Sequence, residues 1–302
     1  MASKGSTKGA ERGAAVAAAA VDRPEAIRNV AVVGHSGSGK TTLVEGLLLA
    51  TGTISRAGSV PDGTTVSDAD PAEVKQQRSV SLSVAPFEHN GIKVNLLDTP
   101  GYADFVGELR AGLRAADAAL FVVSAVDGVD ATTIALWEEC AAVGMPRAVV
   151  VTRLDHQRAD FEESVAVCRR VFGDNVLPLY LPLHADDGTV GGLIGLLSRT
   201  VQDSSTGSLV ERPADPEHLA LIEAQRNELI EGIIAESEDE SLMDRYLNGE
   251  EIEFDTLVAD LEKAVARGNF YPVIPVCSAT GVGLDALLDG LVNGAPSPLE
   301  HD

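Results

Sequence analysis

One eight-residue stretch, GHSGSGKT at residues 34–41, constrains this chain more than any other part of its sequence. It matches the pattern G-x-x-x-x-G-K-[ST] and lies between a β-branched run at 27–34 and a helical pattern at 40–50, the context that confirms such a match. Its glycines let backbone N–H groups turn inward around a phosphate, and the following helix offers its positive end. The stretch predicts a strand, a phosphate-binding loop and a helix, in that order.

Individual residues of this loop have expected roles. Lys40 should reach the β- and γ-phosphates of a nucleotide, and Thr41 should place its hydroxyl on Mg²⁺. His35 could be catalytic, although a histidine packed against backbone is the simpler interpretation. The other residues expected to contact the nucleotide here are Ser36, Gly37, Ser38, Gly39 and Thr42.

A second nucleotide signal is DTPG at residues 98–101, where an apolar run at 92–98 ends. A carboxylate at the C-terminal edge of a sheet can hold a magnesium-bound water, which is the role expected of Asp98. Gly101 can present its backbone N–H to a γ-phosphate. Together with the first loop, these residues predict a nucleoside triphosphate with Mg²⁺, and they leave the base open.

Short β-branched runs alternate with amphipathic stretches along most of the chain. This alternation predicts an α/β fold with a mostly parallel, doubly wound sheet. Beyond the runs already named, strands are expected at 119–126, 147–155 and 271–279, and helices after residue 102, at about 130–143 and at about 282–293.

Two segments interrupt this alternation. A polar stretch at about 51–81 reads as a long functional or mobile loop. Residues 174–269 read as strands around a turn followed by acidic helices, and are expected to form an inserted α+β subdomain. The nucleotide-binding domain would then comprise 27–173 and 270–302, preceded by a disordered tail at 1–26 whose alanines are too weakly apolar for a secretion signal.

The charge balance limits the partners that this chain can have. Its 46 acidic and 23 basic residues give a formal net charge of −23, which opposes non-specific adhesion to nucleic acid or anionic lipid. The acidic residues cluster in the inserted subdomain, as a solvated face or as a docking surface for a basic partner. No apolar run is long enough to span a membrane. The three cysteines are widely spaced, which predicts no disulfide or zinc site and fits a reducing cytoplasm.

Two later segments indicate which base the nucleotide carries. Asp155 follows a predicted strand, where its carboxylate could accept paired hydrogen bonds from guanine N1–H and N2–H₂, which adenine cannot offer. The run Ser278, Ala279 and Thr280 follows the last predicted strand and could supply a backbone N–H to guanine O6. In their order after the phosphate loop and DTPG, these segments indicate a GTPase and disfavour an ATP-using enzyme.

The ordered motifs resemble those of the translational GTPases, and most closely the G domain of elongation factor G. The resemblance is carried by residues 39–63, by QQRSVSLS at 76–83 and by the stretch from 98 to 129. It implies a P-loop NTPase (G-protein) fold with an inserted G′ subdomain, GTP or GDP and Mg²⁺ as ligands, and the ribosome as partner, with a basic ribosomal protein meeting the acidic insertion. Elongation factor G continues into further domains, so the resemblance also implies that this chain is a fragment without them.

Five positions depart from the family pattern. Ser81 stands where a family threonine closes over Mg²⁺, and it keeps the hydroxyl. Gly37 stands in place of a loop aspartate, and Thr152 and Arg153 replace the Asn and Lys of N-K-x-D. Tyr102 replaces a histidine that orients the attacking water, and a phenol stays neutral at pH 7 and gains no cationic form.

Two functions remain open at this point. The chain could be a GTPase that is slow alone and is stimulated when its full-length parent meets the ribosome, with Lys40, Gly101 and Tyr102 at the reacting phosphate. Alternatively, it could be a GTP- and GDP-binding switch that does not turn over, with Tyr102 packed as an ordinary aromatic residue at the start of a helix.

Overall fold

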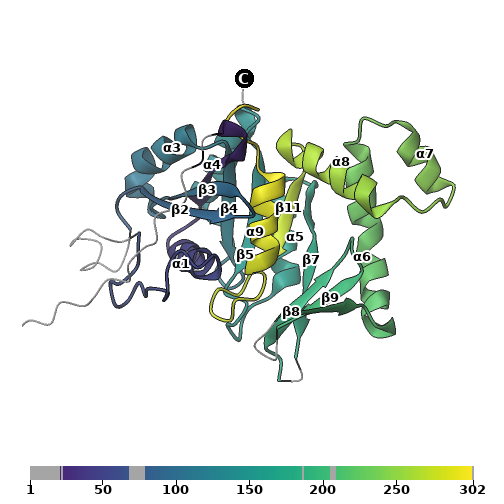
Figure 1. The fold of residues 1–302 in the computed structure, drawn as a ribbon, viewed down its shortest axis with the longest axis horizontal. Coiled ribbons are helices and arrows are strands. Elements are labelled where there is room, and N and C mark those ends of the chain that lie inside the picture. Colours follow the sequence, from purple (N-terminus) through teal and green to yellow (C-terminus); the bar gives the residue numbers. More distant parts are fainter. Residues whose placement is uncertain (1–20, 22, 68–78, 186, 205–208, 301–302) are drawn as a thin grey trace, which may run out of the picture.

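The computed structural model of the protein describes residues 21, 23–67, 79–185, 187–204 and 209–300. Its centre is a seven-stranded sheet (Figure 1) in which every neighbouring pair is parallel except the edge pair β2 and β3. The order across the sheet is β2 (Ser83–His89), β3 (Ile92–Asp98), β1 (Ile27–Val33), β4 (Ala118–Ser124), β5 (Arg147–Thr152), β11 (Tyr271–Pro275) and β6 (Val176–Pro178). The predicted α/β fold with a mostly parallel sheet is confirmed.

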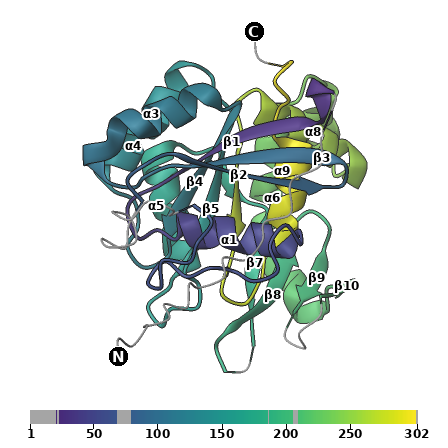
Figure 2. The ribbon, with the colours of Figure 1, turned by 60° about the vertical axis from the view of Figure 1, so that its left-hand side comes forward.

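Helices cover both faces of this sheet (Figure 2). One face carries α1 (Lys40–Ala50) and α9 (Leu284–Gly294), which contact each other and β3. The other face carries α3 (Val106–Ala115), α4 (Ala131–Ala142) and α5 (Phe161–Phe172). Such double winding brings the C-terminal ends of the parallel strands to one edge, where the loops that follow them can build a site.

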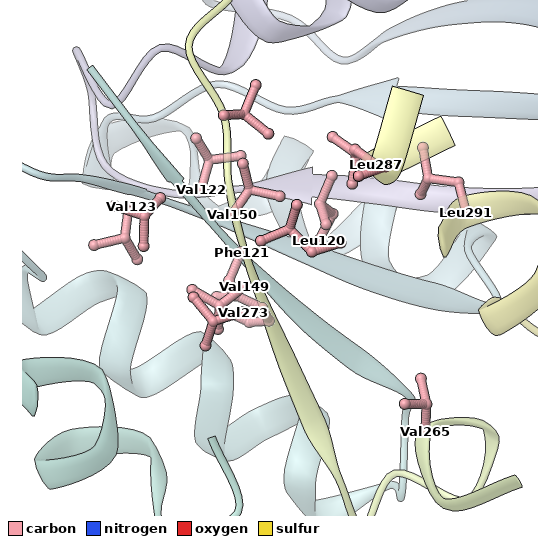
Figure 3. Close-up of a cluster of buried hydrophobic side chains, with 14 of the residues drawn as sticks. Leu120, Phe121, Val122, Val123, Val149, Val150, Val265, Val273, Leu287 and Leu291 are labelled. Atoms are coloured by element: carbon pink, nitrogen blue, oxygen red, sulfur yellow. The ribbon is translucent and has the colours of Figure 1, made fainter. Parts of the chain in front are cut away.

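The core is densest around β4, all seven of whose residues are buried. Side chains alternate across a strand, so Leu120 lies toward Leu287 of α9 (Figure 3) while Phe121 lies toward α4 and α5. On that second side, the Phe121 ring lies 4.9 Å from the Trp137 ring, which stacks on Phe172 at 4.2 Å. Truncating such a buried aromatic residue costs about 3–5 kcal/mol, so this cluster fixes the strand that supports the site.

A second, antiparallel sheet lies beside the first. It has the order β10 (Val210–Pro213), β9 (Thr200–Asp203), β8 (Val190–Gly195) and β7 (Tyr180–His184), and it is followed by α6 (Pro216–Ala235), α7 (Ser241–Leu247) and α8 (Phe254–Ala266). Leu179 alone separates β6 from β7; its N–H donates to Val273 of the large sheet and its carbonyl accepts from Leu196, each at 3.0 Å. The chain therefore passes from one sheet to the other at a single residue.

One strand, β2, and one helix, α5, of the large sheet region were not anticipated from the sequence, and the strand β6 was expected to belong to the inserted subdomain. The edge strand β2 contains Pro86, which cannot donate to a ladder and is tolerated at a sheet edge. The strand β6 has only three residues, too few for a periodic signal. The helix α5 is amphipathic and is capped by Asp160, whose side chain accepts from the Glu163 N–H at 2.9 Å.

Some expectations fall outside the described residues. The predicted tail lies almost entirely there, and the short 3₁₀ helix η1 (Pro24–Ala26) immediately precedes β1. Residues 68–78 of the polar stretch also lie outside. Within the described part of the chain, every helix is too short or too polar to span a lipid bilayer.

Candidate functional site

The phosphate-binding loop, residues 34–41, joins the buried strand β1 to α1. Two of its glycines are required by geometry. A Cβ on Gly34 would lie 2.4 Å from the carbonyl oxygen of Val122, so β4 leaves no room for one. Gly39 is the residue before α1 and has φ of 94°, a left-handed conformation that L side chains rarely adopt. These two glycines therefore let the loop adopt the backbone conformation that a phosphate-binding loop requires.

Lys40 is buried beneath this loop. Its Nζ donates to the carbonyl oxygens of Gly34 at 2.9 Å and His35 at 3.0 Å. Burial lowers the pKa of Lys40 from 10.5 to about 8, and the negative charges of Asp98 and Asp130 oppose this shift only partly. An ammonium has three donors, so a phosphate oxygen can take the remaining one and relieve the desolvation cost of the charge.

The other residues of this loop differ in how exposed they are to solvent. Ser38 is fully buried, its N–H donates to His35 at 3.2 Å, and its hydroxyl lacks a hydrogen-bond partner among the described residues. Gly37 is exposed at the loop's tip, while Ser36 and His35 are half-buried. Burial lowers the pKa of His35, which favours its neutral form, as expected for a histidine packed into a loop.

Oxygen atoms gather at the first turn of α1. The Thr41 hydroxyl donates to Asp98 Oδ2 at 3.0 Å and lies 3.4 Å from Ser79 Oγ. Ser81, by contrast, is exposed. Hydroxyl and carboxylate oxygens are hard ligands that suit Mg²⁺. Among the described residues, no three His, Cys, Asp or Glu side chains cluster as a metal site.

The DTPG segment lies directly against the phosphate loop. The Thr99 hydroxyl donates to the Val32 carbonyl at 2.6 Å and ties the segment to β1. A Cβ on Gly101 would lie 2.5 Å from Lys40 Nζ and 2.7 Å from the Ser36 amide nitrogen, so only glycine fits in this position. The structure therefore brings together Gly101 and Lys40, the two residues that the sequence predicts at a terminal phosphate.

Tyr102 follows at the rim of the site. It is half-buried, and its carbonyl accepts from the Phe105 N–H at 3.0 Å at the start of the 3₁₀ turn η2 (Ala103–Phe105), which leads into α3. This hydrogen bond fixes the backbone of Tyr102 at the start of the turn that leads into α3.

The residues expected to contact the base are far more accessible. Asp155 is exposed in the turn after β5, and Ala279 and Thr280 are exposed in the turn after β11. The Thr280 N–H is used within this turn, donating to Cys277 at 3.2 Å. The Ser278 and Ala279 amides are therefore the better candidates for a contact with guanine O6.

Thr152 and Arg153, which stand in place of the Asn and Lys of N-K-x-D, link the two halves of the site. The buried Thr152 hydroxyl donates to the Ser38 carbonyl at 2.6 Å and also lies 3.2 Å from the Val123 carbonyl. Arg153 has φ of 59° and its Nη1 donates to the Gly37 carbonyl at 3.2 Å and to Asp127 at 3.1 Å. Both side chains thus hold the end of β5 against the phosphate loop.

Asp127 completes this link and was not singled out from the sequence. A hydrogen bond from the Ser124 hydroxyl is the main cause of its lowered pKa, and Arg153 lowers it further. The sequence signal was present, because SAVDG places a serine at the end of β4 and an acid three residues later, which is a side-chain turn pattern.

Glu45 is a further residue that the sequence did not indicate. It lies on α1 and is 1% exposed. Its Oε2 accepts from the Gly58 N–H at 2.6 Å and its Oε1 accepts from the Val66 N–H at 2.5 Å. One buried carboxylate therefore fastens both ends of an irregular loop to the helix that follows the phosphate cradle. Its partners are backbone amides, which leave no trace in the sequence.

Comparisons with known proteins agree with this geometry. The family model described as the elongation factor Tu GTP binding domain matches residues 25–297. Proteins from two strains of Mycobacterium tuberculosis, each described as an elongation factor G-like protein, are 58% identical over 292 residues, covering 97% of this chain and 40% of the relative. A Thermus thermophilus protein of known crystal structure superposes with a TM-score of 0.83 at 40% identity, covering 91% of this chain and 41% of that one. This chain thus spans about 40% of the length of the relatives it matches.

Proposed function

The chain belongs to the family of elongation factor Tu GTP binding domains, and on that premise we propose that it binds GTP and GDP with Mg²⁺ and hydrolyses GTP slowly unless a ribosome stimulates it. The observation that carries this proposal is the packing of Gly101 against Lys40 and the Ser36 amide. Three groups that can bind a terminal phosphate converge there from two segments far apart in the sequence.

The phosphate half of the site would act by binding and orientation. Backbone N–H groups of residues 36–41, apart from that of Ser38, and the N-terminus of α1 would face a β-phosphate, and Lys40 would contact the β- and γ-phosphates. The pKa of Lys40, about 8 in the ligand-free site, rises when an anion contacts the ammonium, so the lysine stays charged through the reaction.

Mg²⁺ fits the oxygen donors of Thr41 and Asp98, which lie 3.0 Å apart at the base of the cradle. When bound, the metal neutralises charge that develops between the β- and γ-phosphates. Thr41 is held at the first turn of α1 and Asp98 at the end of β3, so neither side chain needs a loop movement to reach it.

Guanine would be selected by Asp155, whose carboxylate pairs with N1–H and N2–H₂, and by an amide of Ser278 or Ala279 at O6. Thr152 and Arg153 would support the base pocket indirectly, through their bonds to the Ser38 and Gly37 carbonyls. Guanine therefore docks against a turn whose position is set by the phosphate loop.

Hydrolysis depends on the water that attacks the γ-phosphate. The Gly101 N–H can stabilise the charge on this phosphate, and the Tyr102 hydroxyl can orient the water without gaining a positive charge. A positioned acid or base contributes about 10²- to 10⁴-fold in rate, which is the shortfall expected relative to a histidine. The second candidate, a switch that binds GTP and GDP without turnover, is favoured by the same substitution.

Phosphate release from GTP by the full-length protein, measured with and without ribosomes, tests these two candidates. We expect slow release without ribosomes, a rise on adding them, and a further rise in Tyr102→His. No release under either condition by the native sequence would reject the enzyme and leave the switch. An unchanged rate in Tyr102→His would show that Tyr102 does not limit turnover.

A ribosomal partner would act through the longer protein, and implies the cytoplasm as the working compartment. The exposed carboxylates of the inserted region would face a basic ribosomal protein. Several of these acids already pair with arginines of the same region, for example Glu223 and Glu251 with Arg199 at 3.3 and 3.2 Å. The chain itself is expected to read no nucleic acid sequence and to bind no membrane.

A further inference from the structure

The long helix α6 carries an arginine on its buried face. Arg226 is only 8% exposed and lies among the buried residues Ile222, Leu229, Ile230 and Ile233 of that face. Its Nε has no hydrogen-bond partner among the described residues. Taking a charge out of water is costly unless hydrogen-bond acceptors or an opposite charge compensate it. Arg226 therefore holds donor capacity that the described part of the chain does not use.

The two carboxylates that act on Arg226 are paired with a different arginine. Glu223 and Glu251 lie 3.3 and 3.2 Å from the guanidinium of Arg199, in the turn between β8 and β9. The Nε of Arg199 is also buried, and it too lacks a hydrogen-bond partner in the part of the chain that the structure describes. Burial and the charge of Arg199 lower the pKa of Arg226, whereas Glu223 and Glu251 oppose this shift. Arginine is not deprotonated in proteins, so both guanidiniums stay charged.

Both arginines line a pocket of about 430 Å³ in the inserted region, between α6, the turn after β8 and the start of α8 (Figure 1). Its apolar walls come from Leu197, Ile252 and Phe254, and the carboxylates of Glu251 and Glu253 also line it. Phe254 is 46% exposed, so one side of its ring is open to the pocket and to solvent. Small-molecule sites have volumes of about 300–1,000 Å³, apolar walls and a few convergent polar groups, as this pocket has.

We propose that this pocket binds a small organic carboxylate, whose charged end pairs with Arg226 and whose apolar body packs on Phe254. A planar guanidinium offers paired N–H donors that match the two oxygens of a carboxylate. The acidic side chains at the pocket favour a ligand with one negative charge over a phosphate group, which carries between about one and a half and two. The pocket shares no residue with the phosphate loop or with the turns proposed to contact guanine, so this binding is separate from that of the nucleotide.

Benzoate is the probe, because it joins a carboxylate to an aromatic ring. It is titrated into the 302-residue chain without nucleotide, so the outcome does not depend on GTP binding. We expect benzoate to shift the Nε–H signal of Arg226 in ¹⁵N-resolved NMR spectra, where the loss of this signal in Arg226→Met identifies it. Benzamide has nearly the same shape without the charge and should bind at least about tenfold more weakly. Inorganic phosphate, which has no apolar body, should also bind more weakly than benzoate.

Substitutions separate a binding role of Arg226 from a structural one. In Arg226→Met, benzoate affinity should fall about 10- to 100-fold, because the charge is removed while the side chain keeps its length. The matched control Arg267→Met removes an arginine at the end of α8 that pairs with Glu238, and should bind benzoate like the unsubstituted chain. Methionine suits a buried helix face, so Arg226→Met should unfold at the same temperature as the unsubstituted chain or at a higher one.

Glu251→Gln changes an exposed side chain and so tests the pocket without disturbing the core. It removes a negative charge that pairs with Arg199, and benzoate affinity should rise. An affinity that stays the same or falls would overturn the proposal. So would an Arg226 signal that does not respond to benzoate, equal binding of benzamide or phosphate, or undiminished binding by Arg226→Met.

Discussion

The phosphate half and the base half of the site are built in opposite ways. Lys40, Thr41 and Asp98 are buried and are hydrogen-bonded before any ligand arrives. Asp155 and Ala279 are exposed on turns. The core therefore holds the phosphate half in place before binding, so little conformational entropy is lost when an anion binds. The base half would become ordered only when a ligand binds, and the proposed selectivity for guanine would depend on very few groups.

The two halves are not independent, because Thr152 and Arg153 hydrogen-bond to the phosphate loop from the strand that carries Asp155. If the contrast is correct, substitutions in the phosphate half should remove all nucleotide binding, those in the base half should remove only selectivity, and those in the link should weaken both by a smaller amount.

The largest effect is expected for Lys40→Met. Removing the ammonium deletes its charge-assisted hydrogen bond to the β-phosphate and leaves the carbonyls of Gly34 and His35 without their donor, so GDP affinity should fall by about 100-fold. Equilibrium binding of a fluorescent GDP measures this. The matched control is Lys263→Met, because Lys263 is exposed on α8 and pairs with Asp260 nearby. A Lys40→Met chain that is folded by circular dichroism yet binds GDP normally would contradict a phosphate half built around this lysine.

Asp155→Ala tests the base half. The preference for GDP over ADP should fall by about 5- to 150-fold, since a bidentate pair to a base is worth about 1–3 kcal/mol of discrimination. Competition of GDP and ADP against the fluorescent nucleotide gives the ratio. Asp174→Ala removes an exposed acid outside the site and should leave it unchanged. Retained selectivity in Asp155→Ala would move base recognition elsewhere.

Thr152→Val tests the link. Valine keeps the shape but leaves the buried Ser38 carbonyl without its donor, at a cost of about 1–3 kcal/mol in unfolding free energy. GDP affinity should fall about tenfold, with the preference over ADP kept. Denaturant unfolding and nucleotide competition measure the two quantities, and Thr152→Ser, which keeps the hydroxyl, should restore both. A loss of selectivity alone would show that Thr152 belongs to the base half.

The smallest effect concerns protons. In the free chain, burial lowers the pKa of Lys40 to about 8, and a bound phosphate raises it again. Binding at pH 8 should therefore take up about half a proton, and affinity should fall as pH rises further. Calorimetry in two buffers of different ionisation enthalpy measures this uptake. Lys40 is mostly charged at pH 7 in both states, so uptake by this residue should be nearly absent there; equal uptake at both pH values would assign the proton to another group.

The parts of this molecule that could be predicted are those whose sequence signal lies within one contiguous stretch. The phosphate loop, DTPG and the apolar runs of the parallel strands each carry their signal within about ten residues, and the fold that they predict is confirmed. The order of β11 and β6 at the far edge could not be read, because it depends on where a long insertion returns to the sheet.

The site residues show the same limit. Ser79 lies beside Thr41, a contact between two separate segments that no local pattern encodes. The turn of Thr152 toward the Ser38 carbonyl likewise depends on how two strands pack. The sequence indicated which residue types gather at the site, and the tertiary contacts decide which of them face the ligand.

The carboxylate of Glu45 has a consequence for how the molecule opens. Gly58 and Val66 lie in a segment without helix or strand, where backbone amides normally exchange with solvent hydrogen freely. Both donate to the same buried side chain. Their amide hydrogens should therefore be protected together and lost together, so that this loop leaves α1 as a single unit and not residue by residue.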